Sequence, residues 1–182
     1  MKKAILLLIT AVVLSICLFA GFSTMATSEK AAMKSNKISF FGTPTSSISS
    51  SVSIPHHYHR LLYSGTVPPL LNEDGKTTYE KYGNTEEQAV GILNKFKEDL
   101  EVKGLSLSDI VYLRVYVAPD PNKGNEPDYA GWFNAYAQFF NTEENPTKTA
   151  RSTVGVESLV SPDFLIEIEA EVAYKKWQLK DN

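Results

Sequence analysis

Two stretches of the chain alternate strictly between apolar and polar residues, and this alternation constrains the fold more than any other feature. In DIVYLRVYVAP (109–119), the odd-numbered positions from 111 to 117 are aliphatic, whereas the even-numbered ones are Tyr112, Arg114 and Tyr116. In IEIEAEVAYK (166–175), every second position from 167 to 171 is a glutamate. Successive side chains of a strand point to opposite faces. Each stretch is therefore predicted to be a strand with one apolar face and one amphipathic face.

The remaining periodic segments place helices between the strands. Further strands are predicted at 37–42, 59–65 and 149–157, and the glutamate-bearing strand is predicted to span 164–174. A first helix is predicted after Thr85, which serves as its N-cap with Gln88 completing a capping box. Gly104 is predicted at its C-terminal end, where a left-handed residue is favoured. A second helix follows Asp128 and is rich in aromatic residues, which are predicted to serve a core or an interface. The order ββ-α-β-α-ββ predicts an α+β domain with a mixed β-sheet and two helices on one face.

Three connections carry turn-forming or polar residues. The segment TPTSSISSSVSIP (43–55) is typical of a flexible loop. The segments 66–84 and 119–127 hold Pro, Gly and Asn and are predicted to be long connections. We expect these two to decorate the surface, with a position over a cleft as the alternative.

The N-terminus reads as a secretory signal. Lys2 and Lys3 precede an apolar run at 4–22, and small residues follow, with cleavage predicted after Ala26. Residues 1–26 are thus a predicted signal peptide and 27–37 a solvated linker. This predicts a periplasmic or secreted protein without a membrane association once the signal is removed. An uncleaved membrane anchor is the main alternative; lipidation at Cys17 is disfavoured by the bulky Ile16 before it.

Cysteine usage and charge exclude several classes of function. Cys17 is the only cysteine, so removal of the signal leaves no disulfide, no thiol nucleophile and no cysteine metal site. Removing Lys2 and Lys3 from the 18 basic residues leaves 16 against 21 acidic ones, a net charge of −5. Because nucleic-acid binding draws affinity from phosphate neutralisation, this balance argues against a nucleic-acid partner.

The histidines His56, His57 and His59 are the remaining candidates for metal binding. Only His57 and His59 can share a strand face, and no cysteine or HExxH partner accompanies them. We therefore predict no metal site here and expect an exposed strand edge.

Several phrases resemble one known family. They are YSGTVP (63–68), Q-A-x-x-I-L-x-x-F (88–96), LSDIVYLRVYV (107–117), FNAYAQFF (133–140) and, most specifically, ARSTVGVESL with IEIEAEVA (150–159 and 166–173). They resemble the Rid family of imine deaminases, also called the YjgF family, from about Phe40 to Lys175. The resemblance implies a chorismate-mutase-like domain, taken as 38–176 with a tail at 177–182. It also implies a homotrimer whose sheets line an inner barrel, with active-site clefts between neighbouring subunits.

The same resemblance assigns roles to particular residues. Arg151 would hold a substrate carboxylate as a bidentate pair, and Glu167 would orient or activate the attacking water. Backbone groups near Gly65 and Thr153 would help to bind the substrate. Two positions depart from the family: Thr153 replaces a cysteine, and Ser51 replaces a tyrosine. The smaller Ser51 predicts a larger or more polar pocket and gives the Ser-rich segment a possible role in the site.

The resulting functional hypothesis is hydrolytic deamination of small 2-imino acids to 2-oxo acids and ammonia. No cofactor or metal is expected, because a protonated imine is already electrophilic. The alternative is a non-catalytic trimeric protein of the same fold that binds a small carboxylate, which the predicted export makes a serious rival. Ribonuclease activity, a label that some family members carry, is disfavoured by the acidic balance.

Overall fold

The computed structural model describes residues 35–180. The chain divides into two compact units, 1–39 and 40–182, and only residues 35–39 of the first are described. The predicted signal peptide therefore lies outside the described residues, as does most of the predicted linker. Across the described range, no helix is long and apolar enough to cross a membrane.

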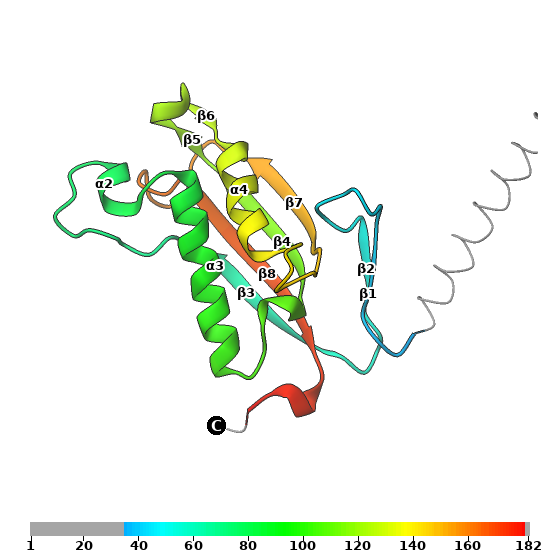
Figure 1. Cartoon of the computed structure of the whole chain (residues 1–182). Coiled ribbons are helices and arrows are strands. Elements are labelled where there is room, and N and C mark those ends of the chain that lie inside the picture. Colours follow the sequence, from blue (N-terminus) through cyan, green and yellow to red (C-terminus); the bar gives the residue numbers. More distant parts are fainter. Residues whose placement is uncertain (1–34, 181–182) are drawn as a thin grey trace, which may run out of the picture. The chain divides into compact units, whose positions relative to one another are not determined.

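A four-stranded mixed sheet forms the centre of the second unit (Figure 1), in the order β3-β8-β4-β7. Strand β8 pairs antiparallel with both β3 and β4, whereas β4 and β7 run parallel. The mixed sheet was predicted from the order of the elements. Its strands are β3 (His59–Thr66), β4 (Ile110–Val117), β7 (Ala150–Gly155) and β8 (Ile166–Tyr174).

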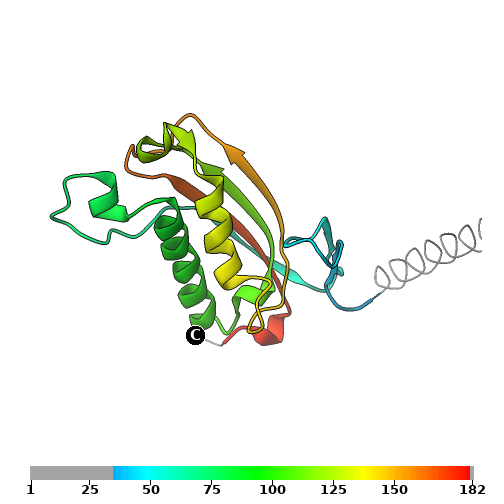
Figure 2. The same cartoon turned by 45° about the horizontal axis from the view of Figure 1, so that its top comes forward.

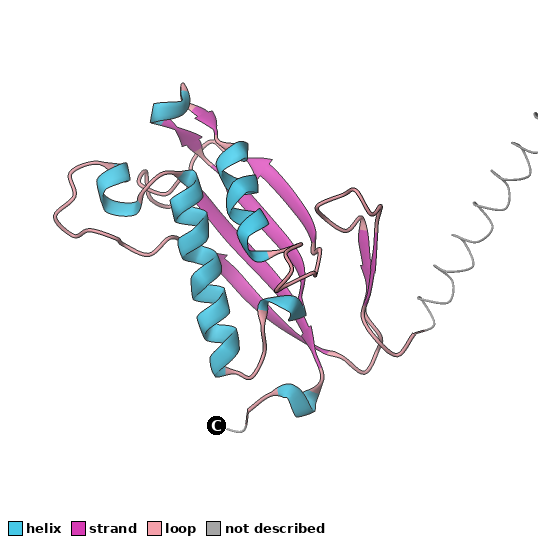
Figure 3. Ribbon diagram, in the orientation of Figure 1, coloured by secondary structure: helices cyan, strands magenta, loops and turns pink. Residues whose placement is uncertain are grey.

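Two long helices, α3 (Thr85–Val102) and α4 (Tyr129–Phe139), cover one face of this sheet. They lie side by side in both views of the molecule (Figures 1 and 2). Figure 3 shows the two helices on the same side of the four strands. The hydrophobic core fills the space between them and the sheet, and includes Phe96 of α3 and Trp132 of α4. The predicted α+β arrangement is confirmed.

The strand alternation explains which face is covered. The odd-numbered residues of β4 from Val111 to Val117 are buried, as are Ile166 and Ile168 of β8. The opposite, amphipathic face carries Tyr112, Arg114 and Tyr116 of β4 and the three glutamates of β8. Ile110 belongs to the core instead, because the pairing of β4 with β8 shifts between Ile110 and Tyr112. On the amphipathic face, Arg114 pairs with Glu169, and Arg60 Nη1 lies 2.8 Å from Glu171 Oε1.

The first long helix begins one residue earlier than predicted. Its N-cap is Asn84, which accepts from Glu87 N at 3.0 Å, while the Glu87 carboxylate accepts from Asn84 N at 2.8 Å. Gln88 is instead buried and links the helix to the start of β8, because its Oε1 accepts from Leu165 N at 2.8 Å. The helix end agrees with the prediction, since Gly104 has a φ of +82°.

Two connections contain secondary structure that the sequence did not reveal. The first holds a short helix, α2 (Thr78–Tyr82), and the second holds the short strands β5 (Pro119–Asp120) and β6 (Glu126–Pro127). The Tyr79 hydroxyl donates to the buried Asp120 carboxylate at 2.6 Å. Burial and this hydrogen bond raise the pKa of Tyr79 to about 12. This hydrogen bond thus links the connection at 66–84 to the connection at 119–127.

The Ser-rich segment is also ordered, contrary to the flexible loop that was predicted. It contains β2 (Ser51–Ser53), which pairs with β1 (Ser39–Phe41). Ser49 N donates to Thr149 O at 3.1 Å, and Ser49 Oγ donates to Lys148 O at 2.5 Å. This segment therefore lies beside the start of β7.

The two candidate caps of α3 can be separated by substitution. We expect Asn84→Ala to lower the free energy of unfolding by about 1 kcal/mol, because the Glu87 backbone N–H loses its side-chain acceptor. Thr85→Val should cost far less, because the Thr85 hydroxyl is buried without a hydrogen-bond partner. Urea denaturation of both variants measures the difference. Equal losses would show that Thr85 is the cap.

Candidate functional site

The guanidinium of Arg151 is enclosed by aromatic rings. Arg151 lies on β7, where it pairs with Leu113 of β4, and its side chain points toward α4. The guanidinium carbon Cζ is 5.5 Å from the ring centroid of Trp132, 4.8 Å from that of Phe133 and 4.3 Å from that of Tyr136. All three distances are within the range of cation–π attraction.

Arg151 has no carboxylate partner within the described part of the chain. No Asp or Glu oxygen of that part lies within 4.0 Å of its nitrogens, and its Nη1 atom is buried without a hydrogen-bond partner. Burial lowers the pKa of the guanidinium. A partly buried cation without an anion is still destabilising, and aromatic faces offset only part of that cost. The site is therefore suited to receiving an anion.

A cavity of about 230 Å³ adjoins this guanidinium. Phe133, Tyr136, Ala137, Phe140, Ser47 and Asn141 complete its lining. Arg151 is the only ionisable cation in that lining. The planar guanidinium group of Arg151, surrounded by mostly apolar walls, can hold one small carboxylate in a fixed orientation through two parallel hydrogen bonds.

The chain path explains why α4 supplies these walls. Strands β4 and β7 are parallel neighbours, and α4 lies between them in the sequence. A parallel pair needs a crossover connection that packs back on the sheet. On β7, Arg151 and Thr153 face this helix, and Thr153 Oγ1 accepts a hydrogen bond from Trp132 Nε1 at 3.1 Å. Ser152 faces the other way, because its hydroxyl contacts that of Tyr112 at 2.6 Å.

Glu167 lies on the opposite face of the sheet from Arg151. It is half-buried and pairs with Tyr116 in the register of β8 and β4. Its carboxylate lies directly over Gly65, where an added Cβ would be 1.8 Å from Glu167 Oε1. The pairing of β3 with β8 is irregular between Tyr63 and Thr66. This bulge and the missing side chain of Gly65 together make room for the carboxylate.

The predicted site residues therefore form two groups within one chain. Arg151 and Thr153 face α4, whereas Gly65 and Glu167 meet on the amphipathic face. Ser51 belongs to neither group: it is exposed on β2, and Ser47 of the same segment lines the Arg151 cavity.

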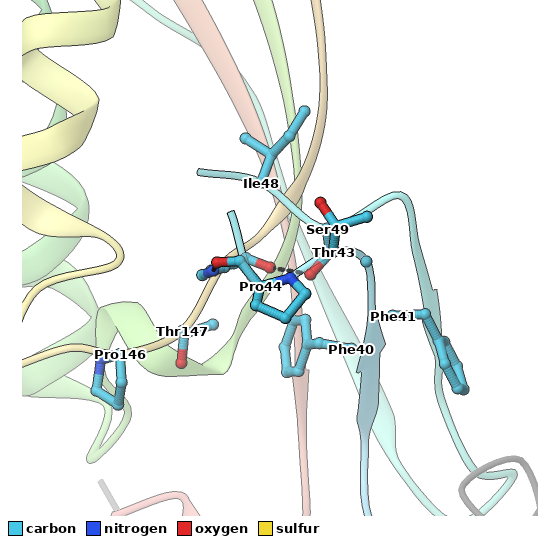
Figure 4. A pocket seen from close by; sticks show the side chains of 10 residues that line it. Phe40, Phe41, Thr43, Pro44, Ile48, Ser49, Pro146 and Thr147 are labelled. Carbon is cyan, nitrogen blue, oxygen red and sulfur yellow. Dashed lines mark hydrogen bonds between the residues drawn. The ribbon is translucent and has the colours of Figure 1, made fainter. Parts of the chain in front are cut away.

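The Ser-rich segment is held in place near this cavity. Between it and the residues before β7 lies a second cavity of about 260 Å³, lined in part by Phe40, Ile48 and Thr147 (Figure 4). Lys148 Nζ donates to Pro44 O at 2.9 Å across this region. These contacts keep the wall that contains Ser47 close to β7.

Sequence reasoning missed the aromatic enclosure of Arg151. The aromatic residues of α4 were predicted to serve a core or an interface, and Trp132 and Tyr136 are indeed buried. What was not anticipated is that β4 and β7 are parallel neighbours joined by α4. This connection places α4 over the strand that carries Arg151. His56, His57 and His59 are exposed, as expected. In the range 35–180, no group of three or more His, Cys, Asp or Glu residues is placed to hold a metal ion.

Comparisons with known proteins agree with this fold and its motifs. The profile of the family described as Endoribonuclease L-PSP matches residues 47–174. A RutC family protein of Pyrococcus horikoshii is 35% identical over 116 residues, which is 64% of this chain and 79% of the relative. A RutC family protein of Pyrococcus abyssi is 36% identical over 94 residues, covering 52% of this chain and 65% of the relative.

Among solved structures, YyfB of Yersinia pestis is similar to this chain. It is a protein of unknown function in the Rid family, with a TM-score of 0.55 and 27% identity, over 76% of this chain and 98% of its own. Fold and motifs thus define a Rid/YjgF-like α+β protein. The chain belongs to the family whose profile is described as Endoribonuclease L-PSP.

The contact between Gly65 and Glu167 can be tested by a double-mutant cycle. We expect Gly65→Ala to lower the free energy of unfolding by about 1 kcal/mol, because the new methyl group must displace the Glu167 carboxylate. The loss stays near the low end of overpacking costs, since only the tip of a flexible side chain has to move. In a Glu167→Ala background, Gly65→Ala should cost almost nothing. Equal costs in both backgrounds, measured by urea denaturation, would contradict the contact.

Proposed function

We propose that the protein binds small 2-imino acids through Arg151 and hydrolyses them to 2-oxo acids and ammonia. The observation that carries the proposal is the side chain of Arg151, which lines a cavity and whose Nη1 atom is buried without a hydrogen-bond partner among the described residues. A substrate carboxylate would neutralise this cation and fix the substrate by a bidentate pair. Family membership supports the same function, and the specific activity is our proposal.

The chemistry needs only orientation and a positioned water. Water adds to the carbon of the protonated imine, and the resulting carbinolamine loses ammonia to leave the 2-oxo acid. Glu167 would hold the water and accept its proton, which then leaves with the ammonia as ammonium. Arg151 would contribute by holding the substrate still beside that water.

The placement of Glu167 requires a second copy of the chain. Within one chain, Arg151 and Glu167 lie on opposite faces of the sheet, so one copy does not supply both groups to one substrate. We propose that the protein forms a homotrimer in which the Arg151 cavity of one subunit meets the Gly65–Glu167 group of the next. In a closed ring of three subunits, each subunit contacts the next through different surfaces, so the trimer contains three such junctions.

Ammonia release from enzymatically generated 2-iminobutyrate tests the reaction. We expect the native protein to accelerate release, and Arg151→Ala to lower kcat/KM by about 100-fold, as expected for loss of a buried charged pair. Arg151→Lys is the matched control, because it keeps the charge but loses the planar fork. It should recover only part of the activity. Native-like activity of Arg151→Ala would overturn the assignment.

Mixing two impaired variants tests whether the site is shared. We expect Arg151→Ala and Glu167→Gln each to retain only about one hundredth of native activity alone. Refolded together in equal amounts, they should recover up to about one quarter of native activity, because about one junction in four then combines an intact Arg151 with an intact Glu167. No recovery from properly assembled mixtures would contradict a site shared between subunits.

The second candidate function is binding of a small carboxylate without turnover. The observation that favours it is that the Arg151 cavity is built by a single chain and does not include Glu167. Binding of 2-oxobutyrate that depends on Arg151, together with no acceleration of ammonia release, would establish this function in place of catalysis.

The family description also names an endoribonuclease. The acidic balance of the chain and the exposed placement of its three histidines do not favour RNA cleavage. Failure to bind RNA at both low and high salt would dispose of this activity.

A further inference from the structure

Two threonines flank Arg151 on the helix-facing side of β7. Thr149 directly precedes the strand and is fully buried, and Thr153 follows Arg151 by two positions. Because strand side chains alternate, Thr149, Arg151 and Thr153 all face α4. The guanidinium thus lies between two hydroxyl groups along the strand.

Each of these hydroxyl groups is hydrogen-bonded to one of the rings that enclose the guanidinium. Trp132 Nε1 donates to Thr153 Oγ1 at 3.1 Å. The Tyr136 hydroxyl lies 3.2 Å from Thr149 Oγ1 and also accepts from Thr149 N at 3.2 Å. Trp132 and Tyr136 are one helical turn apart, with ring centroids 5.7 Å apart in an edge-to-face arrangement. Both rings are therefore attached to the strand that carries Arg151.

The orientation of these rings decides where the guanidinium fork points. Arg151 has no described anionic partner to fix its side chain, so the faces of the rings are its main restraint. A bidentate pair requires both nitrogens of the fork in one plane with the carboxylate. A tilt of the indole would free the guanidinium to rotate out of the orientation that a bidentate pair requires.

We propose that Thr153 is a positioning residue for carboxylate recognition, and that it acts on Arg151 through the indole of Trp132. Thr149 acts in the same way through Tyr136. The inference rests on the proposed function for its ligand, but the geometry can be measured without any ligand. The hydroxyl at 153 matters here as an acceptor for an N–H group, which valine cannot provide and serine can.

The experiment compares Thr153→Val with Thr153→Ser. The dissociation constant for 2-oxobutyrate is measured by calorimetry, and the indole N–H and guanidinium signals are recorded by NMR without ligand. We expect Thr153→Val to weaken binding about fivefold, to shift the Trp132 indole signal and to remove the ring-shifted guanidinium signals. Its Tm should fall by a few degrees, because the buried indole N–H loses its acceptor. Thr153→Ser should retain native values. The only other tryptophan, Trp177, is exposed, so Trp177→Phe assigns the two indole signals.

The outcomes separate this inference from the proposed function. Native guanidinium signals in Thr153→Val would overturn the positioning role, and so would equal weakening of binding in the valine and serine variants. If the native protein binds no 2-oxo acid, the proposed function fails. The ligand-free signals of the valine and serine variants then still decide whether Thr153 positions Arg151.

Discussion

The site depends on one unbalanced charge. Arg151 is held against three aromatic rings of α4 and has no carboxylate partner in the described part of the chain. Cation–π contacts are strongest when they are desolvated, and here they stabilise a cation that burial alone would disfavour. If Arg151 formed a structural ion pair, its positive charge would already be neutralised. Leaving it unpaired beside a cavity keeps it available for a ligand.

The mixed topology of the sheet makes this arrangement possible. Because β4 and β7 are parallel, α4 crosses over them and lays its aromatic residues on the edge strand that carries Arg151. The antiparallel strands β8 and β3 instead bring Glu167 to Gly65 on the opposite face. The same sheet thus presents an anion-binding group, Arg151, on one face and a carboxylate, Glu167, on the other. The proposed mechanism therefore needs two subunits, one supplying each group.

The sequence was sufficient for the architecture and for the identity of the central residue. Strict alternation in β4 and β8 predicted both faces of the sheet, and Asp128 and Gly104 marked helix ends correctly. The cap of α3 was misplaced by one residue, because Asn84 with Glu87 and Thr85 with Gln88 both match a capping box. Only the tertiary contact of Gln88 with Leu165 separates them. The Ser-rich segment was misjudged, because its order comes from long-range hydrogen bonds to Lys148 and Thr149 that composition does not encode.

The candidate site was harder to predict than the fold. Motif resemblance pointed to Arg151 and Glu167, but their separation onto two faces follows from strand alternation combined with the parallel pairing of β7. That pairing is a long-range contact, and the local sequence pattern does not reveal it. Ser47, rather than Ser51, lines the cavity, since the path of the hairpin determines which serine faces inward.

A crystal structure of the protein with 2-oxobutyrate tests the central claim most directly. The carboxylate should lie within hydrogen-bond distance of the Arg151 guanidinium, in the cavity walled by Phe133 and Tyr136. A ligand bound elsewhere, or an Arg151 paired with an acidic side chain of a neighbouring copy, would contradict it.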